Sequence, residues 1–181
     1  RATRMEPSAT LAVDNKAKAL KKAGKPVISF GAGEPDFDSP PAAASYAERA
    51  IGEGRTHYTQ SNGIPELREA VASYYSNRFD LDYPMDQIII GSGAKPLIYG
   101  SLASLVDPGD EVLVFSPAWV SYVEQIGLLD GRAVVVDTAD TGNIPLASRI
   151  AEAITPRTVG MLINTPNNPT GAVYDEASLR E

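Results

Sequence analysis

The sequence contains no cysteine and only one histidine among its 181 residues. It therefore has no disulfide framework, no thiolate nucleophile and no cysteine-ligated metal, and one histidine excludes a cluster of histidine ligands. Acidic residues outnumber basic ones by 23 to 16, so the basic stripe of a nucleic-acid surface is lacking. No hydrophobic run approaches the length of a membrane span, and no signal peptide is visible. We therefore expect a cytoplasmic protein that binds neither nucleic acid nor membrane.

The length of 181 residues is enough for one domain with a small addition. The composition, 43% hydrophobic and 22% charged, is that of an ordinary globular protein. Strands are predicted at 27–30, 88–90, 111–115, 132–136 and 159–163. Helices are predicted at 8–23, 41–52, 65–79, 96–106, 118–129 and 147–154, and another begins within 174–181. This alternation predicts an α/β fold, a mostly parallel sheet with helices on both faces, preceded by an N-terminal helix or arm.

The most specific stretch is Asn164-Thr-Pro-Asn-Asn-Pro-Thr-Gly171, which follows the strand predicted at 159–163. We expect that strand to be buried, as strands of parallel sheets are. Two prolines in four residues fix φ and bias the residues before them toward extended backbone. Asn168 is therefore expected in an extended loop at the carboxyl end of a strand, where ligands of α/β sheets bind. A lone Asn-Pro is more typical of an ordinary turn, but the whole octapeptide is more specific.

Two other loops follow predicted strands. Gly91-Ser-Gly-Ala-Lys95 leads into a helix, whose free amides favour an anion, although such a turn is often plain architecture. Its spacing fits neither a nucleotide P-loop nor a dinucleotide-binding motif. Ser116-Pro-Ala-Trp-Val-Ser-Tyr122 contains the only tryptophan, Trp119. A single tryptophan is usually a core residue, but a flat ring at a strand end can instead stack on an aromatic cofactor.

Taken together, these motifs resemble those of the pyridoxal-phosphate-dependent aminotransferases of class I/II, the fold type I family, and most closely its bacterial aspartate aminotransferase branch. The octapeptide contains the family's Asn-Pro-Thr-Gly signature. The segment Gly31–Asp36 resembles the family's substrate loop, and Thr56–Gln60 resembles the loop that crosses to the partner subunit of a homodimer. The resemblance extends from residue 8 to residue 174, which is almost the whole chain but only about the first half of a family member.

The resemblance implies that pyridoxal 5'-phosphate is the cofactor. Because the sequence has no cysteine and a single histidine, we expect no metal site. The residues that it implies for cofactor binding are Gly93, Ala94, Lys95, Trp119, Asn168 and, toward the partner subunit, Tyr58. Those that it implies for substrate binding are Gly33, Trp119 and Asn168. In these roles the 93–95 turn holds the phosphate, Trp119 stacks on the pyridine ring, and Asn168 donates to the phenolate oxygen of the ring. Gly33 lies beside the substrate carboxylate.

The same resemblance divides the chain into residues 1–38, an N-terminal arm and small-domain segment, and residues 39–181, the N-terminal part of the large cofactor-binding domain. In the family, the Schiff-base lysine lies downstream of the Asn-Pro-Thr-Gly signature. The aspartate that pairs with the pyridine nitrogen and the arginine that binds the substrate carboxylate lie downstream as well. The catalytic lysine is therefore unassigned, and we expect a C-terminal portion beyond this sequence.

The reaction implied is transamination between an amino acid, aspartate or a related one, and a 2-oxo acid. Glu6 stands where bacterial relatives often have a basic residue, which weakens the case for a dicarboxylic substrate. Two alternatives stay open. In the first, the chain is a non-catalytic fragment or assembly module without the Schiff-base lysine. In the second, it is part of a fold type I lyase or another pyridoxal-phosphate enzyme.

The missing lysine leads to the first prediction. The isolated 181-residue chain neither forms a covalent bond with pyridoxal phosphate nor transaminates, because the lysine that makes this bond lies outside it. Absorbance spectra of the chain after incubation with the cofactor and gel filtration test this. A cofactor band that survives gel filtration and disappears with borohydride would show the prediction to be wrong.

Overall fold

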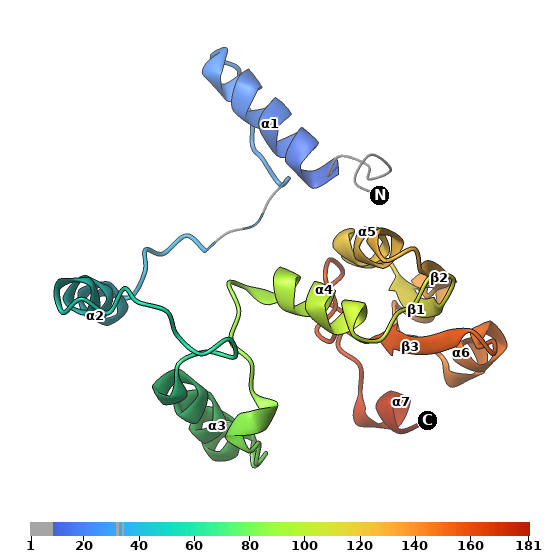
Figure 1. Cartoon of the computed structure of the whole chain (residues 1–181). Coiled ribbons are helices and arrows are strands. Elements are labelled where there is room, and N and C mark those ends of the chain that lie inside the picture. Colours follow the sequence, from blue (N-terminus) through green and yellow to red (C-terminus); the bar gives the residue numbers. More distant parts are fainter. Residues whose placement is uncertain (1–8, 32, 34) are drawn as a thin grey trace. The chain divides into compact units, whose positions relative to one another are not determined.

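The computed structural model describes residues 9–31, 33 and 35–181 (Figure 1). The described residues group into two compact units. The first comprises residues 94–181 together with residues 9–12, and the second comprises residues 13–93. The division predicted between residues 38 and 39 concerns the complete protein and stays a prediction.

A three-stranded parallel sheet forms the centre of the first unit. Its strands are β1 (Glu111–Ser116), β2 (Arg132–Asp137) and β3 (Thr158–Leu162), in the order β2-β1-β3. Parallel strands require crossover connections, and helices supply them here. The crossover helices are α5 (Ser121–Leu128) between β1 and β2, and α6 (Ala147–Ala153) between β2 and β3. The predicted parallel α/β sheet is confirmed.

Helices pack against both faces of the sheet, because successive side chains of a strand point to opposite faces (Figure 1). Val112 and Val114 of β1 join a hydrophobic cluster that includes residues of α5 and of α4 (Ala94–Ala103). Leu113 and Phe115 pack instead against α6. β1 is the central strand and all its residues except the last are buried, as expected of a parallel strand.

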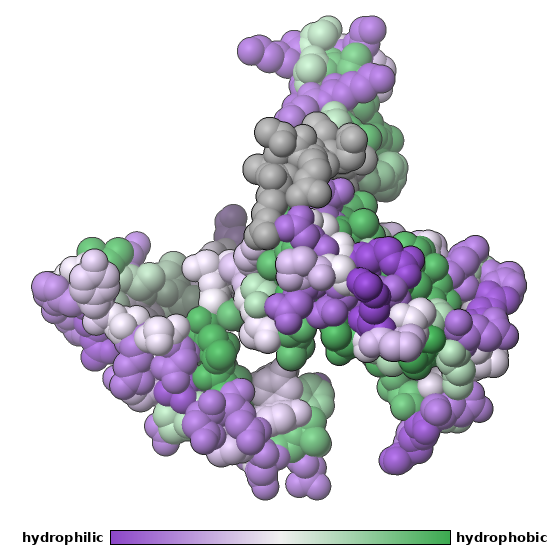
Figure 2. Space-filling view, turned by 45° about the vertical axis from the view of Figure 1, so that its right-hand side comes forward, coloured by the Kyte–Doolittle hydropathy of each residue, from purple (hydrophilic) through white to green (hydrophobic). Residues whose placement is uncertain are grey.

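β3 forms where it is predicted, but the expectation that it is buried is wrong. Val159 and Met161 are 43% and 41% exposed, and Ile163, which follows the strand, is 52% exposed. The reason is that β3 has a strand neighbour only on its β1 side within the described residues. Figure 2 shows hydrophobic surface, in green, beside hydrophilic surface, in purple.

Helices dominate the second unit, and proline starts two of them. The helices of this unit are α2 (Pro41–Gly52), α3 (Pro65–Phe79), the short 3-10 helix η2 (Met85–Gln87) and most of α1 (Ala9–Lys22). Those that begin with proline are α2 and α3. Proline is favoured at the first helical position, where its missing amide removes no intrahelical bond. The bounds of α2 and α3 match the prediction. The remaining short helices, in the first unit, are η3 (Ala139–Thr141) and α7 (Glu176–Arg180). No helix among the described residues is long and apolar enough to cross a membrane.

Two predicted strands, 27–30 and 88–90, are absent from the described residues. In the second of them, backbone groups find partners outside any strand ladder. The carbonyl of Ile88 accepts a hydrogen bond from Nε of Arg68 at 3.1 Å, and the amide of Ile90 donates to the carbonyl of Asn62 at 3.0 Å. Because these groups are satisfied within the unit, this β-branched run stays extended without a strand partner.

A buried carboxylate connects the three strands at their amino ends. Glu111 of β1 is only 4% exposed. Its carboxylate accepts hydrogen bonds from the guanidinium of Arg132 in β2 and, at 2.8 Å, from the hydroxyl of Thr155 just before β3. These bonds, that of Arg132 first, hold the pKa of Glu111 below its ordinary value, because both stabilise the ionised form.

We expect Glu111→Gln to lower the thermal midpoint of unfolding at pH 7 by roughly 5 °C, since a buried hydrogen-bonded network is broken. The folded pKa of Glu111 is lowered, so its contribution to stability is present above the unfolded pKa and is lost as the pH falls through the folded pKa. The difference between variant and wild type should therefore shrink in acid. Calorimetry across pH measures it, with Glu48→Gln on the exposed side of α2 as control. A difference that does not change with pH would contradict the role of the ionised carboxylate.

Candidate functional site

The loops after β1 and β3 leave the same edge of the sheet, because parallel strands share their carboxyl edge. The loop after β1 runs from Pro117 to the start of α5 and contains Trp119. The loop after β3 contains the octapeptide 164–171. The peptide bonds before Pro117, Pro166 and Pro169 are cis. The two motifs that the sequence points to most strongly thus begin side by side.

The predicted phosphate-binding turn is the amino end of α4. The helix begins at Ala94, two residues earlier than predicted, which brings Ala94 and Lys95 into its first turn. The first amides of a helix have no intrahelical partner and lie at the positive end of the helix dipole. Gly93, immediately before, has φ +83°, while a Cβ built there meets no atom within 4 Å. The backbone conformation, rather than crowding, therefore favours glycine at this turn.

Lys95 and Trp119 are neighbours in the first unit. Nζ of Lys95 lies 5.1 Å from the centroid of the indole ring, a cation–π contact. The indole also meets the ring of Tyr122 edge-on, with centroids 5.4 Å apart. The backbone of Lys95 is held too, because its carbonyl accepts a hydrogen bond from Nε2 of buried Gln125 at 3.0 Å. Helix α5 therefore fixes both the phosphate turn and the aromatic ring.

Asn168 lies in a turn, so the predicted extended loop is wrong. The amide of Gly171, at φ +74°, donates to the carbonyl of Asn167 at 2.7 Å and closes the turn. The backbone amide of Asn168 donates to Oδ1 of Asn164 at 2.9 Å. A fixed proline φ suits turns as well as extended chain, and Gly171 allows the reversal. The side chain of Asn168 is exposed and makes no hydrogen bond within the described residues, so its amide can reach a ligand.

Gly33 and Tyr58 belong to the second unit. Tyr58 is fully exposed, and its neighbour His57 is exposed as well. Gly33 is exposed, and a Cβ built there meets no atom within 4 Å. Their roles at a substrate and at a partner subunit involve groups outside this unit, so these roles stay predictions.

Sequence reasoning does not single out Thr138 and Asn167, which hold the loop after β1 from both sides. Thr138, 2% exposed, donates its amide and its hydroxyl to the carbonyl of Ser116, each at 2.9 Å. Asn167, 7% exposed, donates Nδ2 to the carbonyl of Pro117 at 2.9 Å. Two successive carbonyls are thus bound from the β2 side and from the β3 side. Only the position of Asn167 inside the octapeptide hints at such a role in the sequence.

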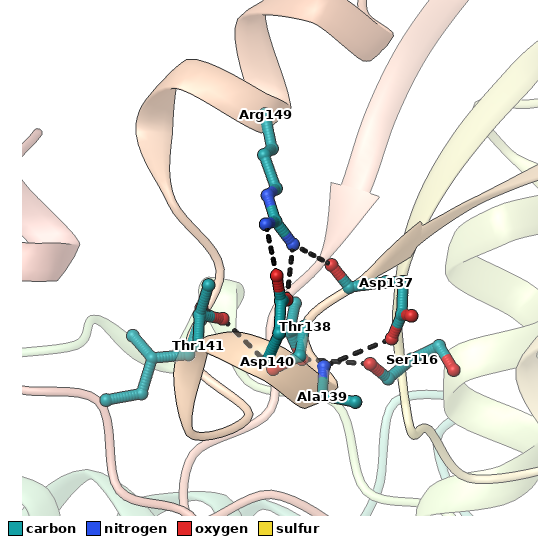
Figure 3. Close-up of polar contacts among 8 residues, drawn as sticks. Ser116, Asp137, Thr138, Ala139, Asp140, Thr141 and Arg149 are labelled. Carbon is teal, nitrogen blue, oxygen red and sulfur yellow. Dashed lines mark hydrogen bonds and ion pairs between the residues drawn. The ribbon is translucent and has the colours of Figure 1, made fainter.

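Thr138 is part of a polar network at the end of β2 (Figure 3). Arg149 of α6 donates through both terminal nitrogens to the carboxylate of Asp140, each at 2.7 Å, and also to the carbonyl of Asp137. The hydrogen bond with Arg149 lowers the pKa of Asp140, and the same bond raises the pKa of Arg149. The backbone amides of Thr141 and Asn143 donate to the carbonyl of Thr138 at 3.1 and 2.8 Å. This network of hydrogen bonds holds the backbone of Thr138 in place.

The groups at the carboxyl edge suit an anionic ligand with an aromatic ring. Ala94 and Lys95 contribute helix amides and an ammonium group, Trp119 contributes a flat ring, and Asn168 contributes a free carboxamide. No group of three or more His, Asp or Glu residues within the described parts of the chain is placed to hold a metal ion. The residues present therefore fit the phosphate and the ring of pyridoxal phosphate.

Comparison with known proteins agrees with this geometry. The model of the family "Aminotransferase class I and II" matches residues 25–181. A probable aspartate/prephenate aminotransferase of Rhizobium leguminosarum is 43% identical over 98% of this chain and 45% of its own length. The aspartate/prephenate aminotransferase of Cereibacter sphaeroides is 44% identical over 97% of this chain and 44% of its own length. The chain therefore spans about half the length of these relatives.

A solved structure gives the same result. The aspartate aminotransferase of Thermus thermophilus with maleate is 42% identical and superposes with a TM-score of 0.93. The superposition covers 98% of this chain and 47% of that chain. The likeness in sequence thus extends to the fold.

We expect Thr138→Val, which keeps the shape of the side chain, to lower the free energy of unfolding by about 1 kcal/mol. The variant loses the hydroxyl bond to Ser116 but keeps the amide bond to the same carbonyl. Urea denaturation measures the change. Thr56→Val, at an exposed position of the second unit, is the matched control and should stay within about 0.5 kcal/mol of wild type. Equal effects of the two variants would argue against a stabilising hydrogen bond from the Thr138 hydroxyl to the Ser116 carbonyl.

Proposed function

The chain belongs to the aminotransferase class I and II family, and from this we propose that the protein containing it transfers an amino group between an amino acid and a 2-oxo acid. The observation that carries the proposal is the meeting of the α4 amino end, Lys95 and Trp119 at the carboxyl edge of the sheet. Lys95 and the helix end attract an anion, while Trp119 offers a surface for a flat ring.

We propose pyridoxal 5'-phosphate as the cofactor, which when bound supplies an electron sink for amino transfer. The amides of Ala94 and Lys95, with the turn at Gly93, hold the phosphate at the positive end of α4. Trp119 fixes the plane of the ring. Asn168 donates a hydrogen bond to the phenolate oxygen, which favours the ionised oxygen over the protonated one. The lysine that binds the cofactor covalently is proposed to lie in the part of the protein beyond this chain.

Aspartate, or a related dicarboxylic amino acid, is the amino donor that the relatives support. Two relatives are aspartate/prephenate aminotransferases, and the Thermus thermophilus structure contains maleate, which is a dicarboxylate. Lys95 gives the site a cationic group suited to a second carboxylate. The acceptor is a 2-oxo acid, and prephenate is one candidate.

The remaining expectations for the complete protein are proposed with this function. The protein is a cytoplasmic homodimer, and Tyr58 reaches the cofactor phosphate of the partner subunit. Gly33 lies beside the substrate carboxylate. The full exposure of Tyr58 supports its proposed contact, because the side chain is available to another subunit.

The direct test uses the complete protein with its native C-terminal portion. Pyridoxal phosphate is added, excess cofactor is removed, and amino transfer from aspartate to 2-oxoglutarate and to prephenate is measured, with other amino acids as competing donors. We expect a bound-cofactor absorbance band and transfer from aspartate. A folded protein that binds no pyridoxal phosphate would overturn the cofactor assignment, and a loaded protein that eliminates instead of transferring would overturn the reaction.

We expect Asn168→Ala to lower kcat/KM for aspartate about tenfold, since a donor to a charged oxygen is lost. Loss of that donor also raises the pH at which the absorbance of the bound cofactor titrates, because ionisation of the bound cofactor becomes less favourable. Spectra recorded across pH detect this shift. Asn77→Ala, on the exposed side of α3, is the matched control and leaves the titration unchanged. An unshifted titration in Asn168→Ala would show that this side chain does not contact the phenolate oxygen.

A further inference from the structure

One buried side chain links the two loops that carry the proposed cofactor contacts. Trp119 follows β1 and Asn168 follows β3, so neither loop determines the position of the other through the chain. Asn167 is 7% exposed, and its Nδ2 donates to the carbonyl of Pro117 and to Oγ1 of Thr170, each at 2.9 Å. Both hydrogens of this amide group are therefore used, one within its own turn and one across to the other loop.

The backbone of Asn167 is fixed as firmly as its side chain. Its amide donates to the carbonyl of Ala172 at 2.8 Å, and its carbonyl accepts from the amide of Gly171 at 2.7 Å. Asn168 follows directly and its own amide is bound by Oδ1 of Asn164. A displacement of Asn167 would therefore move Asn168 with it.

The loop that receives the hydrogen bond leads straight to the aromatic ring. Pro117 lies two residues before Trp119, and the carbonyl of Trp119 accepts from the amide of Tyr122 at 3.1 Å. The preceding carbonyl, that of Ser116, is already bound by Thr138 on the β2 side. The bond from Asn167 is thus the hydrogen bond that holds this loop from the β3 side. Without it, the loop keeps its bond to Thr138 at the start and its contacts with Tyr122 at the end, but no bond to the loop of Asn168.

We propose that Asn167 is a positioning residue, which holds the loop of Trp119 and the loop of Asn168 in one arrangement before the cofactor binds. It acts through these two neighbours and does not itself touch the cofactor. This proposal rests on the function proposed above, since it takes an aromatic phosphate as the ligand that Trp119 and Asn168 share. A site whose parts are already fixed loses less conformational freedom on binding, so the tie favours affinity.

The first experiment needs no cofactor. Hydrogen exchange of the complete protein, free of pyridoxal phosphate, is compared for wild type, Asn167→Asp and Thr170→Val. Asn167→Asp keeps the shape but replaces the donor by a carboxylate oxygen, which cannot bind the Pro117 carbonyl. Thr170→Val removes Oγ1 of Thr170, which accepts from Nδ2 of Asn167 and from the amide of Ala172, both inside the turn. We expect Asn167→Asp to speed exchange at residues 118–122 and 164–172, and Thr170→Val to speed it at 164–172 alone.

Exchange at 118–122 that is the same in Asn167→Asp and wild type would overturn the tie between the loops. Asn77→Asp, with the same chemical change at an exposed position of α3, controls for the added charge. If Asn167→Asp gives too little folded protein, Asn167→Ser replaces it, because the shorter neutral side chain loses the reach to Pro117. We then expect the same pattern of exchange in Asn167→Ser. Exchange at 118–122 equal to that of wild type would contradict the tie between the loops.

The second experiment measures the dissociation constant of pyridoxal 5'-phosphate in a double-mutant cycle. Asn167→Asp and Trp119→Phe are each expected to weaken binding about tenfold, and the double variant much less than the product of about a hundredfold. The effects of Thr170→Val and Trp119→Phe on the dissociation constant should multiply, because Thr170 does not reach the loop of Trp119. Effects of Asn167→Asp and Trp119→Phe that multiply would show that Asn167 acts independently of the ring, and the positioning role would be wrong.

The two experiments separate this proposal from the proposed function. A wild-type protein that does not bind pyridoxal phosphate contradicts the proposed cofactor, while hydrogen exchange still decides whether Asn167 ties the loops. Tight binding with no coupling between Asn167 and Trp119 leaves the function standing and overturns the positioning role.

Discussion

The candidate site depends on the central position of β1 in the sheet. Because β1 has a parallel neighbour on each side, the chain that leaves its carboxyl end can be held from both directions. Thr138 at the end of β2 binds one carbonyl of that chain, and Asn167 after β3 binds the next. An edge strand would offer such an anchor on one side only. The ring of Trp119 owes its fixed position to this arrangement, together with its packing on the cluster beneath α4 and α5.

The two ends of the sheet have different roles. The amino ends of the strands contribute to stability, and the carboxyl ends carry the candidate binding site. At the amino ends, the carboxylate of Glu111 is buried, and each of its oxygens accepts a hydrogen bond, one from β2 and one from the segment before β3. At the carboxyl ends, the amides of α4 and the side chains of Lys95 and Asn168 are exposed. Buried polar groups are costly unless paired, whereas a binding site needs polar groups that a ligand can pair. The chain satisfies both demands by placing them at opposite ends of the same three strands.

Much of the fold could be predicted because its signals are local. Proline at the first position of α2 and α3 is a signal in neighbouring residues, and the predicted bounds match. The burial of β3 and the pairing of residues 88–90 depend on partners far away in the chain, so the same hydrophobic pattern misleads there. The site divides in the same way. Family motifs indicate Lys95, Trp119 and Asn168, whereas the partners of Thr138 and Asn167 lie 22 and 50 residues away and leave no pattern in the sequence.

The turn before α4 constrains the sequence through chirality and not through size. Gly93 has φ +83°, and open space lies where a Cβ would be. An alanine there would meet no atom with its Cβ, and its obstacle is the cost of about 1–2 kcal/mol that an L-residue incurs in a left-handed conformation. Only asparagine and aspartate soften that cost, because they tolerate this region better than other side chains. Among small residues, substitutions at this position should consequently sort by backbone preference.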